Sequence, residues 1–241
     1  MYRFFLDGKI DGMAHIDGKD AKHIRDVLRM KEGEEIIVCD GDMTDYVCRI
    51  LGFGKNRVEI LPMYVKESEA EPKVKVVLYQ GLPKRDKFEL IIEKCVELGV
   101  FEVVPVNTMR SIPVIEGKEE KKLVRWGNIS MAAAKQSGRG IVPEIRRTME
   151  FKEAVLDAAQ NCDLVLFPYE NEEDTHLRDV IVNFEGEKIG VFIGPEGGFD
   201  KTEADFAESH GARAVSLGKR ILRTETAGFA CLSMIMYQLD K

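Results

Sequence analysis

From Pro72 onward, apolar runs of strand length alternate with helical stretches, and this alternation restricts the fold more than any other feature of the chain. Val74–Tyr79 is almost unbroken apolar sequence, and Asp86–Leu98 follows it with apolar residues at helical spacing. Further apolar runs of strand length lie at Phe101–Val106, Leu164–Phe167, Ile189–Ile193 and Ala212–Ser216. Strands separated by helices pair in parallel, and the helices pack on the sheet faces. The sequence therefore predicts an α/β fold with a mostly parallel sheet and helices on both faces.

The first 70 residues have a different pattern, in which short strand-like runs are joined by turn signals. The runs are Tyr2–Leu6, Glu35–Cys39, Thr44–Phe53 and Arg57–Pro62, with one helical pattern at Asp20–Met30. This order predicts a small antiparallel β-barrel. The polar stretch Lys66–Pro72 has no apolar period and is expected to be a linker. We therefore expect two domains, a β-barrel at 1–70 and an α/β domain at 73–241.

Composition and charge exclude several classes of protein. The net charge is −7 and apolar residues make up 44% of the sequence, as in a globular protein with a substantial core. No apolar stretch reaches the ~20 residues that span a membrane, and no signal-peptide pattern is present, so a cytoplasmic protein is expected. The five cysteines and four histidines lack metal-ligand spacing, which argues against a metal site. The acidic charge disfavours a nucleic-acid partner unless basic residues gather locally.

Two loops near the C-terminus follow strand-like runs and lead into helical patterns. The first is Gly194-Pro195-Glu196-Gly197-Gly198-Phe199, and the second runs from Leu217 to Ala227. In open α/β sheets, ligands bind at the carboxyl ends of the strands, and glycines let the backbone approach a ligand closely. Phosphate-binding glycine motifs and the Gly-x-Ser-x-Gly elbow of esterases are absent. The loops therefore predict a pocket for a nucleoside rather than for a phosphate chain.

The motifs in these loops closely resemble those of the RsmE family. The first loop is followed by Glu203, and the second reads Leu217-Gly218-x-Arg220-Ile221-Leu222-Arg223-x-Glu225-Thr226-Ala227. Weaker matches extend along the chain, at Arg3-Phe4-Phe5, His23-x-x-x-Val27-Leu28-Arg29, Lys84, Lys87, Glu93–Val100, Gln136-Ser137-x-Arg139 and Val142-Pro143. Two positions depart from the family pattern, since Lys135 stands at a usually acidic position and Asn107–Ser111 keeps only the Arg-Ser pair of its block.

The resemblance implies a SPOUT-class methyltransferase that uses S-adenosylmethionine to methylate N3 of a uridine in 16S rRNA of the small ribosomal subunit, as naked RNA or in the assembled subunit. It also implies a trefoil knot in the C-terminal part, a PUA-like RNA-binding barrel before it, and a homodimer. Residues of these motifs and of the preceding strand end are expected to bind the cofactor. They are Leu166, Phe167, Glu170, Gly194, Pro195, Glu196, Gly197, Gly198, Ser216, Leu217, Gly218, Ile221, Leu222 and Thr226.

The chemistry of uridine methylation suggests roles for four charged residues. N3 of uracil carries a proton and is a poor nucleophile until that proton leaves or is shared. Arg223 and Arg139 are expected to stabilise negative charge or to hold phosphate, because a guanidinium is a poor base. Glu225 and Glu196 are candidate proton acceptors. Glu225 could equally be structural, since a carboxylate in the first turn of a helix favours the helix dipole.

Basic residues in several segments are candidates for RNA contacts, although scattered Lys and Arg are more often solvated surface. They are Arg3, Lys22, Arg25, Arg29, Lys84, Arg85, Lys87, Arg110 and Arg220. Two alternatives stay open: a methyltransferase of the same fold that acts on tRNA or on a ribose hydroxyl, and a non-catalytic module for RNA binding or ribosome assembly. The intact loop motifs disfavour the non-catalytic module, which has no need of both.

Overall fold

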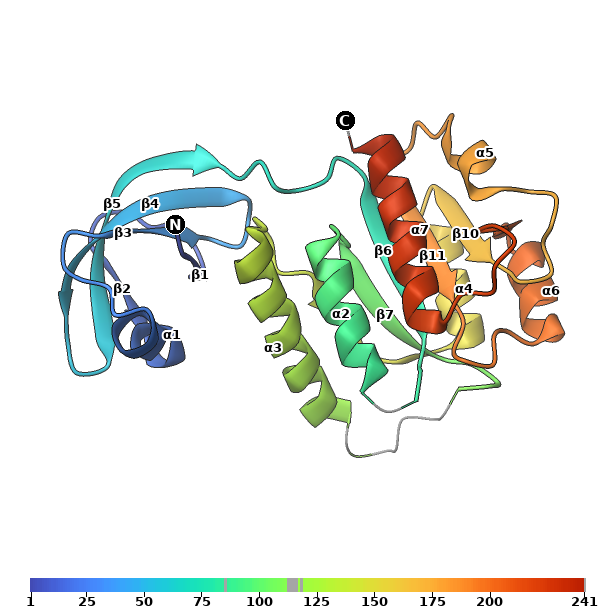
Figure 1. Ribbon diagram of the computed structural model, residues 1–241, viewed down its shortest axis with the longest axis horizontal. Coiled ribbons are helices and arrows are strands. Elements are labelled where there is room, and N and C mark those ends of the chain that lie inside the picture. Colours follow the sequence, from blue (N-terminus) through green and yellow to red (C-terminus); the bar gives the residue numbers. More distant parts are fainter. Residues whose placement is uncertain (85, 112–116, 118, 241) are drawn as a thin grey trace. The chain divides into compact units, whose positions relative to one another are not determined.

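The computed structural model describes residues 1–84, 86–111, 117 and 119–240, which fold into two compact units (Figure 1). The first unit contains Met1–Glu71 together with Ala134–Val142, and the second contains the rest of the chain. The segment 134–142, which the sequence assigns to the second domain, thus folds with the N-terminal unit.

The N-terminal unit is a curled five-stranded sheet with the order β1-β3-β4-β5-β2. Its strands are β1 (Arg3–Phe5), β2 (Ala14–Asp17), β3 (Glu35–Cys39), β4 (Thr44–Phe53) and β5 (Arg57–Glu67). Alternate residues of the strands, such as Ile36 and Val38 of β3, are buried, as expected for a sheet with one face in a core. Ile16 of β2 and Ile24, which lies in the helical segment between β2 and β3, fill the same core.

Three details of this unit differ from the sequence-based prediction. The strand β1 pairs with β3 in parallel, whereas an antiparallel arrangement was expected throughout. The strand β5 continues to Glu67 and pairs with β4 there, so the predicted linker begins later than Lys66. The expected helix at Asp20–Met30 is a short helix α1 (Gly18–Lys22) that passes into a single π-helical turn η1 (His23–Val27). Arg29, with a φ of 54°, lies in the left-handed region and cannot continue it.

The C-terminal unit has the parallel sheet that the alternation of strands and helices predicts. Its strand order is β12-β10-β11-β6-β7-β8, with β9 also pairing with β7, and every ladder among the described residues is parallel. The strands are β6 (Lys75–Gly81), β7 (Glu102–Asn107), β8 (Glu144–Ile145), β9 (Met149–Glu150), β10 (Leu164–Pro168), β11 (Lys188–Ile193) and β12 (Arg213–Val215). The central strands are apolar on both faces because helices cover both.

The helices of this unit form two layers (Figure 1). On one face, α7 (Thr224–Leu239) lies across β6 and β11 and packs against α2 (Lys87–Glu97) and α5 (Leu177–Ile181). On the other face, α4 (Phe151–Asn161) packs against α6 (Lys201–Ser209), β7 and β10. The remaining helix is α3 (Glu119–Ser137). Gly99 follows α2 with a φ of +94°, and Asp200 and Glu203 form a capping box on α6, so glycine ends the one helix and side-chain hydrogen bonds begin the other.

A buried aromatic cluster packs the sheet against α4. The rings of Tyr79 and Phe192 stack with centroids 4.6 Å apart, and Phe151, Phe167 and Phe199 surround them. Such stacked pairs stabilise a core beyond the area that they bury. The cluster lies directly behind the ends of β10 and β11, so it supports the segments that follow these strands.

The hydroxyl of Tyr79 connects this core to a charged network. It donates to Asp157 Oδ2 at 2.6 Å, and Arg146 Nη1 donates to the same oxygen at 3.0 Å. Arg146 also pairs with Glu102 at 3.1 Å. Burial acts to raise the pKa of the Asp157 carboxyl, but the hydrogen bonds from Arg146 and Tyr79 outweigh it and hold that pKa below its ordinary value. The ionised form of the Asp157 carboxyl therefore stabilises the folded state.

We predict that Asp157→Asn lowers the free energy of unfolding by about 2 kcal/mol at pH 7, as expected for hydrogen bonds to a charged group. Because the folded state lowers the pKa of Asp157 from 3.8, its contribution is present above that pH and is lost as the pH falls through the folded-state value. The difference between wild type and variant should therefore shrink between pH 7 and pH 3. Urea unfolding at both pH values checks this, with Asp179→Asn on the exposed α5 as a control. An equal difference at both pH values would contradict the assignment.

Candidate active site

A cavity of about 750 Å³ lies within the C-terminal unit at the carboxyl ends of β10, β11 and β12. Three segments form most of its wall: residues 168–170 from the end of β10 onward, residues 193–196 and 198–199 from the end of β11 onward, and residues 216–224 after β12. Lys87 at the start of α2 completes one side. The volume is within the ~300–1,000 Å³ that is typical of small-molecule sites. The two glycine loops thus meet at one cavity, on the sheet edge where a parallel α/β fold binds ligands.

The backbone of the first loop is tightly folded. The amide of Gly198 donates to the carbonyl of Pro195 at 2.9 Å, and its φ of +66° is one that side chains disfavour. A Cβ at this position would also lie 3.1 Å from the carboxylate of Glu170. The left-handed φ of Gly198 therefore favours glycine, and a side chain there would also have to displace the carboxylate of Glu170.

A buried hydrogen-bond bridge fixes the two loops to each other. Thr224, at the start of α7, donates from Oγ1 to the carbonyl of Gly194 at 2.6 Å. Its Oγ1 accepts from Nε2 of Gln80 at 2.9 Å, and that amide also donates to the carbonyl of Gly81 at 3.0 Å. Gln80 and Thr224 are 0% and 5% exposed. Neither residue is among the predicted site residues, although a glutamine near the end of a mostly apolar strand is a recognisable signal.

A lysine placed between two carboxylates lies at the rim of the cavity. Nζ of Lys87 is 3.2 Å from Oε1 of Glu196 and 3.3 Å from Oε2 of Glu225. The amide of Lys84 donates to both carboxylate oxygens of Glu196 at 3.2 Å. This group of residues joins the start of α2, the first loop and the first turn of α7.

The electrostatics of this cluster favour charged side chains at neutral pH. The contact with Glu196 raises the pKa of the Lys87 ammonium. Partial burial acts to raise the pKa of Glu196, but hydrogen bonds from its own amide and from Lys87 outweigh it and lower that pKa. Oε2 of Glu225 is buried and has no hydrogen-bond donor among the described residues, so the Lys87 ammonium provides its compensating charge.

Most of the residues expected to bind the cofactor line the cavity, and four do not. Those on the wall are Glu170, Gly194, Pro195, Glu196, Gly198, Ser216, Leu217, Gly218, Ile221 and Leu222. Leu166 and Phe167 are fully buried in the core. The strand β10 extends to Pro168, and the segment that reaches the cavity begins at that residue. Gly197 packs against the side chain of Arg110, and Thr226 is exposed on α7.

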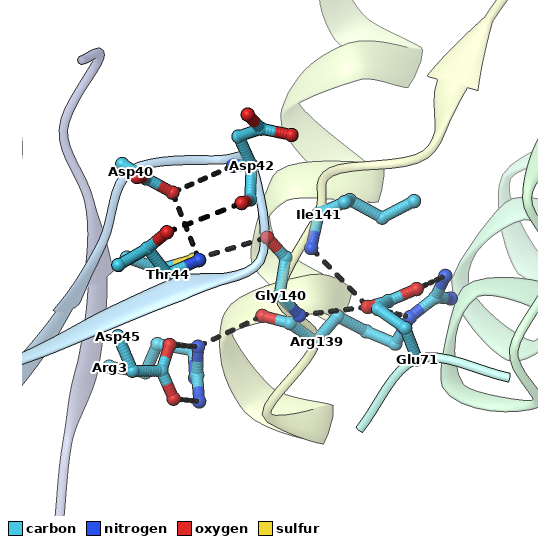
Figure 2. Close-up of polar contacts among 10 residues, drawn as sticks. Arg3, Asp40, Asp42, Thr44, Asp45, Glu71, Arg139, Gly140 and Ile141 are labelled. Atoms are coloured by element: carbon cyan, nitrogen blue, oxygen red, sulfur yellow. Dashed lines mark hydrogen bonds and ion pairs between the residues drawn. The ribbon is translucent and has the colours of Figure 1, made fainter. Parts of the chain in front are cut away.

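The three expected catalytic residues have different surroundings. Arg223 is exposed on the cavity wall, and Glu225 lies behind it in the Lys87 cluster. Arg139 belongs to the N-terminal unit, where it is 2% exposed. Its Nε and Nη2 donate to the carboxylate of Glu71 at 2.8 and 2.6 Å (Figure 2). A buried bidentate ion pair thus engages the guanidinium of Arg139, and its expected charge-stabilising or phosphate-holding role stays a prediction.

The expected RNA-contacting residues separate into exposed and internally paired groups. Exposed residues are Lys22, Arg29, Lys84, Arg110 and Arg220, whereas Arg25 is half-buried beside Asp26. Arg3 is nearly buried, because Nη2 donates to Oδ2 of Asp45 at 2.7 Å and Nη1 donates to the carbonyl of Arg139 (Figure 2). These contacts make Arg3 part of the N-terminal unit's own packing, and its expected contact with RNA stays a prediction. Lys87 is paired as described above, and Arg85 lies outside the described residues.

None of the helices described here has both the length and the apolar character needed to cross a membrane. In the same part of the chain, no group of three or more His, Cys, Asp or Glu side chains is arranged to hold a metal ion.

Comparison with known families and relatives covers nearly the whole chain. Residues 70–236 match an RNA methyltransferase domain, and residues 16–63 match an RNA methyltransferase PUA domain. The chain is 34% identical over 231 residues to ribosomal RNA small subunit methyltransferase E of Bacillus subtilis (strain 168), which covers 93% of this chain and 90% of the relative. It is 34% identical over 233 residues to the protein of the same name from Mesomycoplasma hyopneumoniae (strain 232), covering 97% and 98%.

Two solved structures are similar over the same extent. A methyltransferase from Legionella pneumophila in complex with the cofactor SAM aligns with a TM-score of 0.89 at 31% identity, covering 98% of this chain and 97% of that one. Ribosomal RNA small subunit methyltransferase E from Neisseria gonorrhoeae, bound to S-adenosyl methionine, aligns with a TM-score of 0.86 at 30% identity and the same coverage. The resemblance that the two loop motifs carry is thereby confirmed. The chain belongs to the ribosomal RNA small subunit methyltransferase E family.

Proposed function

We propose that this protein is an S-adenosylmethionine-dependent methyltransferase that modifies N3 of a uridine in 16S rRNA of the small ribosomal subunit, in the cytoplasm. The observation that carries the proposal is the cavity between the two glycine loops, together with relatives of at least 30% identity that bind this cofactor and are named for this RNA. The trefoil knot predicted from the family resemblance belongs to the same proposal.

The residues of the cavity fit this cofactor. The carboxylates of Glu170 and Glu196 favour a ligand that carries sulfonium and ammonium groups, and Leu217 and Leu222 offer aliphatic surface to an adenine ring. When bound, the cofactor supplies a methyl group on a positively charged sulfur. The protein's own task is then to hold the target base in line with that methyl group.

Removal of the proton on N3 is the second requirement. Arg223 lies on the cavity wall, where a guanidinium can stabilise the negative charge that spreads onto the carbonyl oxygens of the deprotonated uracil. Glu225 follows it in the first turn of α7, beside the Lys87 ammonium. We propose that Glu225 assists proton removal, with Lys87 holding its carboxylate in place.

A homodimer also forms part of this proposal. The helix α7 is apolar around most of its circumference, and its outer face exposes Met234 and Tyr237, the latter by 87%. A helix of this kind normally packs on all sides. A second copy of the chain would remove these side chains from water.

The first test is methylation of a defined RNA. We expect the protein to transfer a methyl group from S-adenosylmethionine to N3 of a single uridine in 16S rRNA, given as transcript or as small subunit. Mass spectrometry of nuclease fragments identifies the base and the position. Methylation of tRNA or of a ribose hydroxyl instead would refute the substrate proposal, and the absence of cofactor binding would favour a non-catalytic module.

The second test concerns Glu225. We predict that Glu225→Gln keeps the Kd for S-adenosylmethionine within about twofold but lowers kcat by about 10²-fold or more, the usual contribution of a general base. Calorimetry and single-turnover methylation of 16S rRNA measure the two quantities. Glu208→Gln, an exposed change on α6, serves as the control. Full activity of Glu225→Gln would exclude a role in proton transfer.

A further inference from the structure

Arg110, in the segment that follows β7, binds the first glycine loop from the side opposite the cavity. Its Nη1 donates to the carbonyl of Gly197 at 2.8 Å, and its Nη2 donates to Oδ2 of Asp200 at 3.1 Å. Gly197 is the one residue between Ile193 and Phe199 that does not line the cavity. The guanidinium thus binds the loop at Gly197, the residue that does not line the cavity.

The aliphatic part of Arg110 fills the space beside Gly197. A Cβ added to Gly197 would lie 3.2 Å from Cβ and 3.3 Å from Cδ of Arg110. Such distances are shorter than ordinary contacts between carbon atoms. Arg110 therefore both binds the carbonyl of residue 197 and occupies the place of its side chain.

Two further contacts hold the segment with Arg110 against the same loop. The amide of Met109 donates to Oε1 of Glu203 at 2.8 Å, and the amide of Asp200 donates to Oε2 of the same carboxylate at 2.9 Å. Glu203 is 5% exposed, so these hydrogen bonds are shielded from water. Arg110 is thus presented to the loop by a backbone that is itself fixed.

We propose that Arg110 is a positioning residue, which sets the shape of the Gly194–Phe199 loop for cofactor binding. It is not an RNA contact. The inference rests on the proposed function, because it takes this loop as the cofactor wall. A segment with three glycines loses much conformational entropy when it is ordered. Contacts that order it before the ligand arrives increase affinity by removing that loss from the binding step. Their removal should therefore weaken cofactor binding and leave the chemical step unchanged.

The first experiment compares Arg110→Gln, Arg110→Lys and wild type by calorimetry with S-adenosylmethionine. Arg110→Gln should raise the Kd about tenfold, as expected from the loss of charged hydrogen bonds, with Arg110→Lys in between. The kcat at saturating cofactor should stay within about twofold of the wild-type value. The lost contacts stabilise the bound ground state and the transition state equally, so their loss changes binding and not the chemical step. Arg147→Gln, an exposed arginine, should leave the Kd unchanged.

The same variants separate this role from phosphate binding. The slope of log K against log salt for 16S rRNA should be the same for Arg110→Gln and wild type, whereas loss of a phosphate contact reduces it by about 1. An unchanged cofactor Kd, with or without a lower Tm, would overturn the inference alone. A wild-type protein that does not bind the cofactor would overturn the proposed function and this inference with it.

A double-mutant cycle tests the packing directly. Gly197→Ala should raise the cofactor Kd several-fold in the wild-type background, since the new methyl group displaces the stem of Arg110. In an Arg110→Gly background the same change meets neither Cβ nor Cδ at residue 110 and should have a clearly smaller effect. Equal effects of Gly197→Ala in both backgrounds would show that the two residues act independently and would contradict the proposal.

Discussion

The site depends on one buried bridge, in which Thr224 donates to the carbonyl of Gly194 and accepts from the amide of Gln80. Leaving a buried amide without hydrogen-bond partners costs more free energy than one hydrogen bond contributes. The Gln80 amide, the Thr224 hydroxyl and the Gly194 carbonyl therefore hold one another in place. The bridge joins the end of β6, the first loop and the first turn of α7, which lie far apart in sequence. The bridge thereby holds the two glycine loops on the sides of a single cavity. It also fixes the start of α7, where Arg223 is the N-cap residue and Glu225 lies in the first turn.

Charged residues around this bridge are used largely to hold backbone segments together. Lys87 lies between Glu196 and Glu225, and Arg110 holds the carbonyl of Gly197 and the carboxylate of Asp200. In the N-terminal unit, Arg139 binds Glu71, whose Oε1 also accepts from the amide of Gly140 (Figure 2). Buried or half-buried pairs of this kind are strongly coupled to local geometry, because removal of one partner leaves an uncompensated charge. Lys87 and Arg110, both expected to contact RNA, are thus engaged in contacts within the protein.

The sequence predicted the parallel sheet, its helices and both loops, because apolar periodicity and glycine motifs are local signals. It could not place residues whose surroundings come from distant segments. Leu166 and Phe167 were expected at the end of a strand near a ligand, but β10 continues to Pro168. Phe167 packs in the aromatic core, and Leu166 is fully buried. The parallel pairing of β1 with β3 was missed for the same reason, since short strands joined by turns are usually antiparallel neighbours. Nor does any local pattern show that 134–142 folds with the N-terminal unit.

The glycines of the first loop illustrate how a motif can be recognised for one reason and required for another. The sequence suggested that they allow close approach of a ligand. In the structure, a Cβ at Gly194 would lie 3.1 Å from the backbone of Gly198, and one at Gly198 would lie 3.1 Å from the carboxylate of Glu170. The stem of Arg110 occupies the corresponding space at Gly197. Protein atoms from the loop itself, from the segment after β10 and from the segment after β7 therefore lie close to the places that side chains at these three glycines would occupy. The glycines thus let the loop pack closely against its own protein neighbours, which is a requirement separate from any close approach to the cofactor.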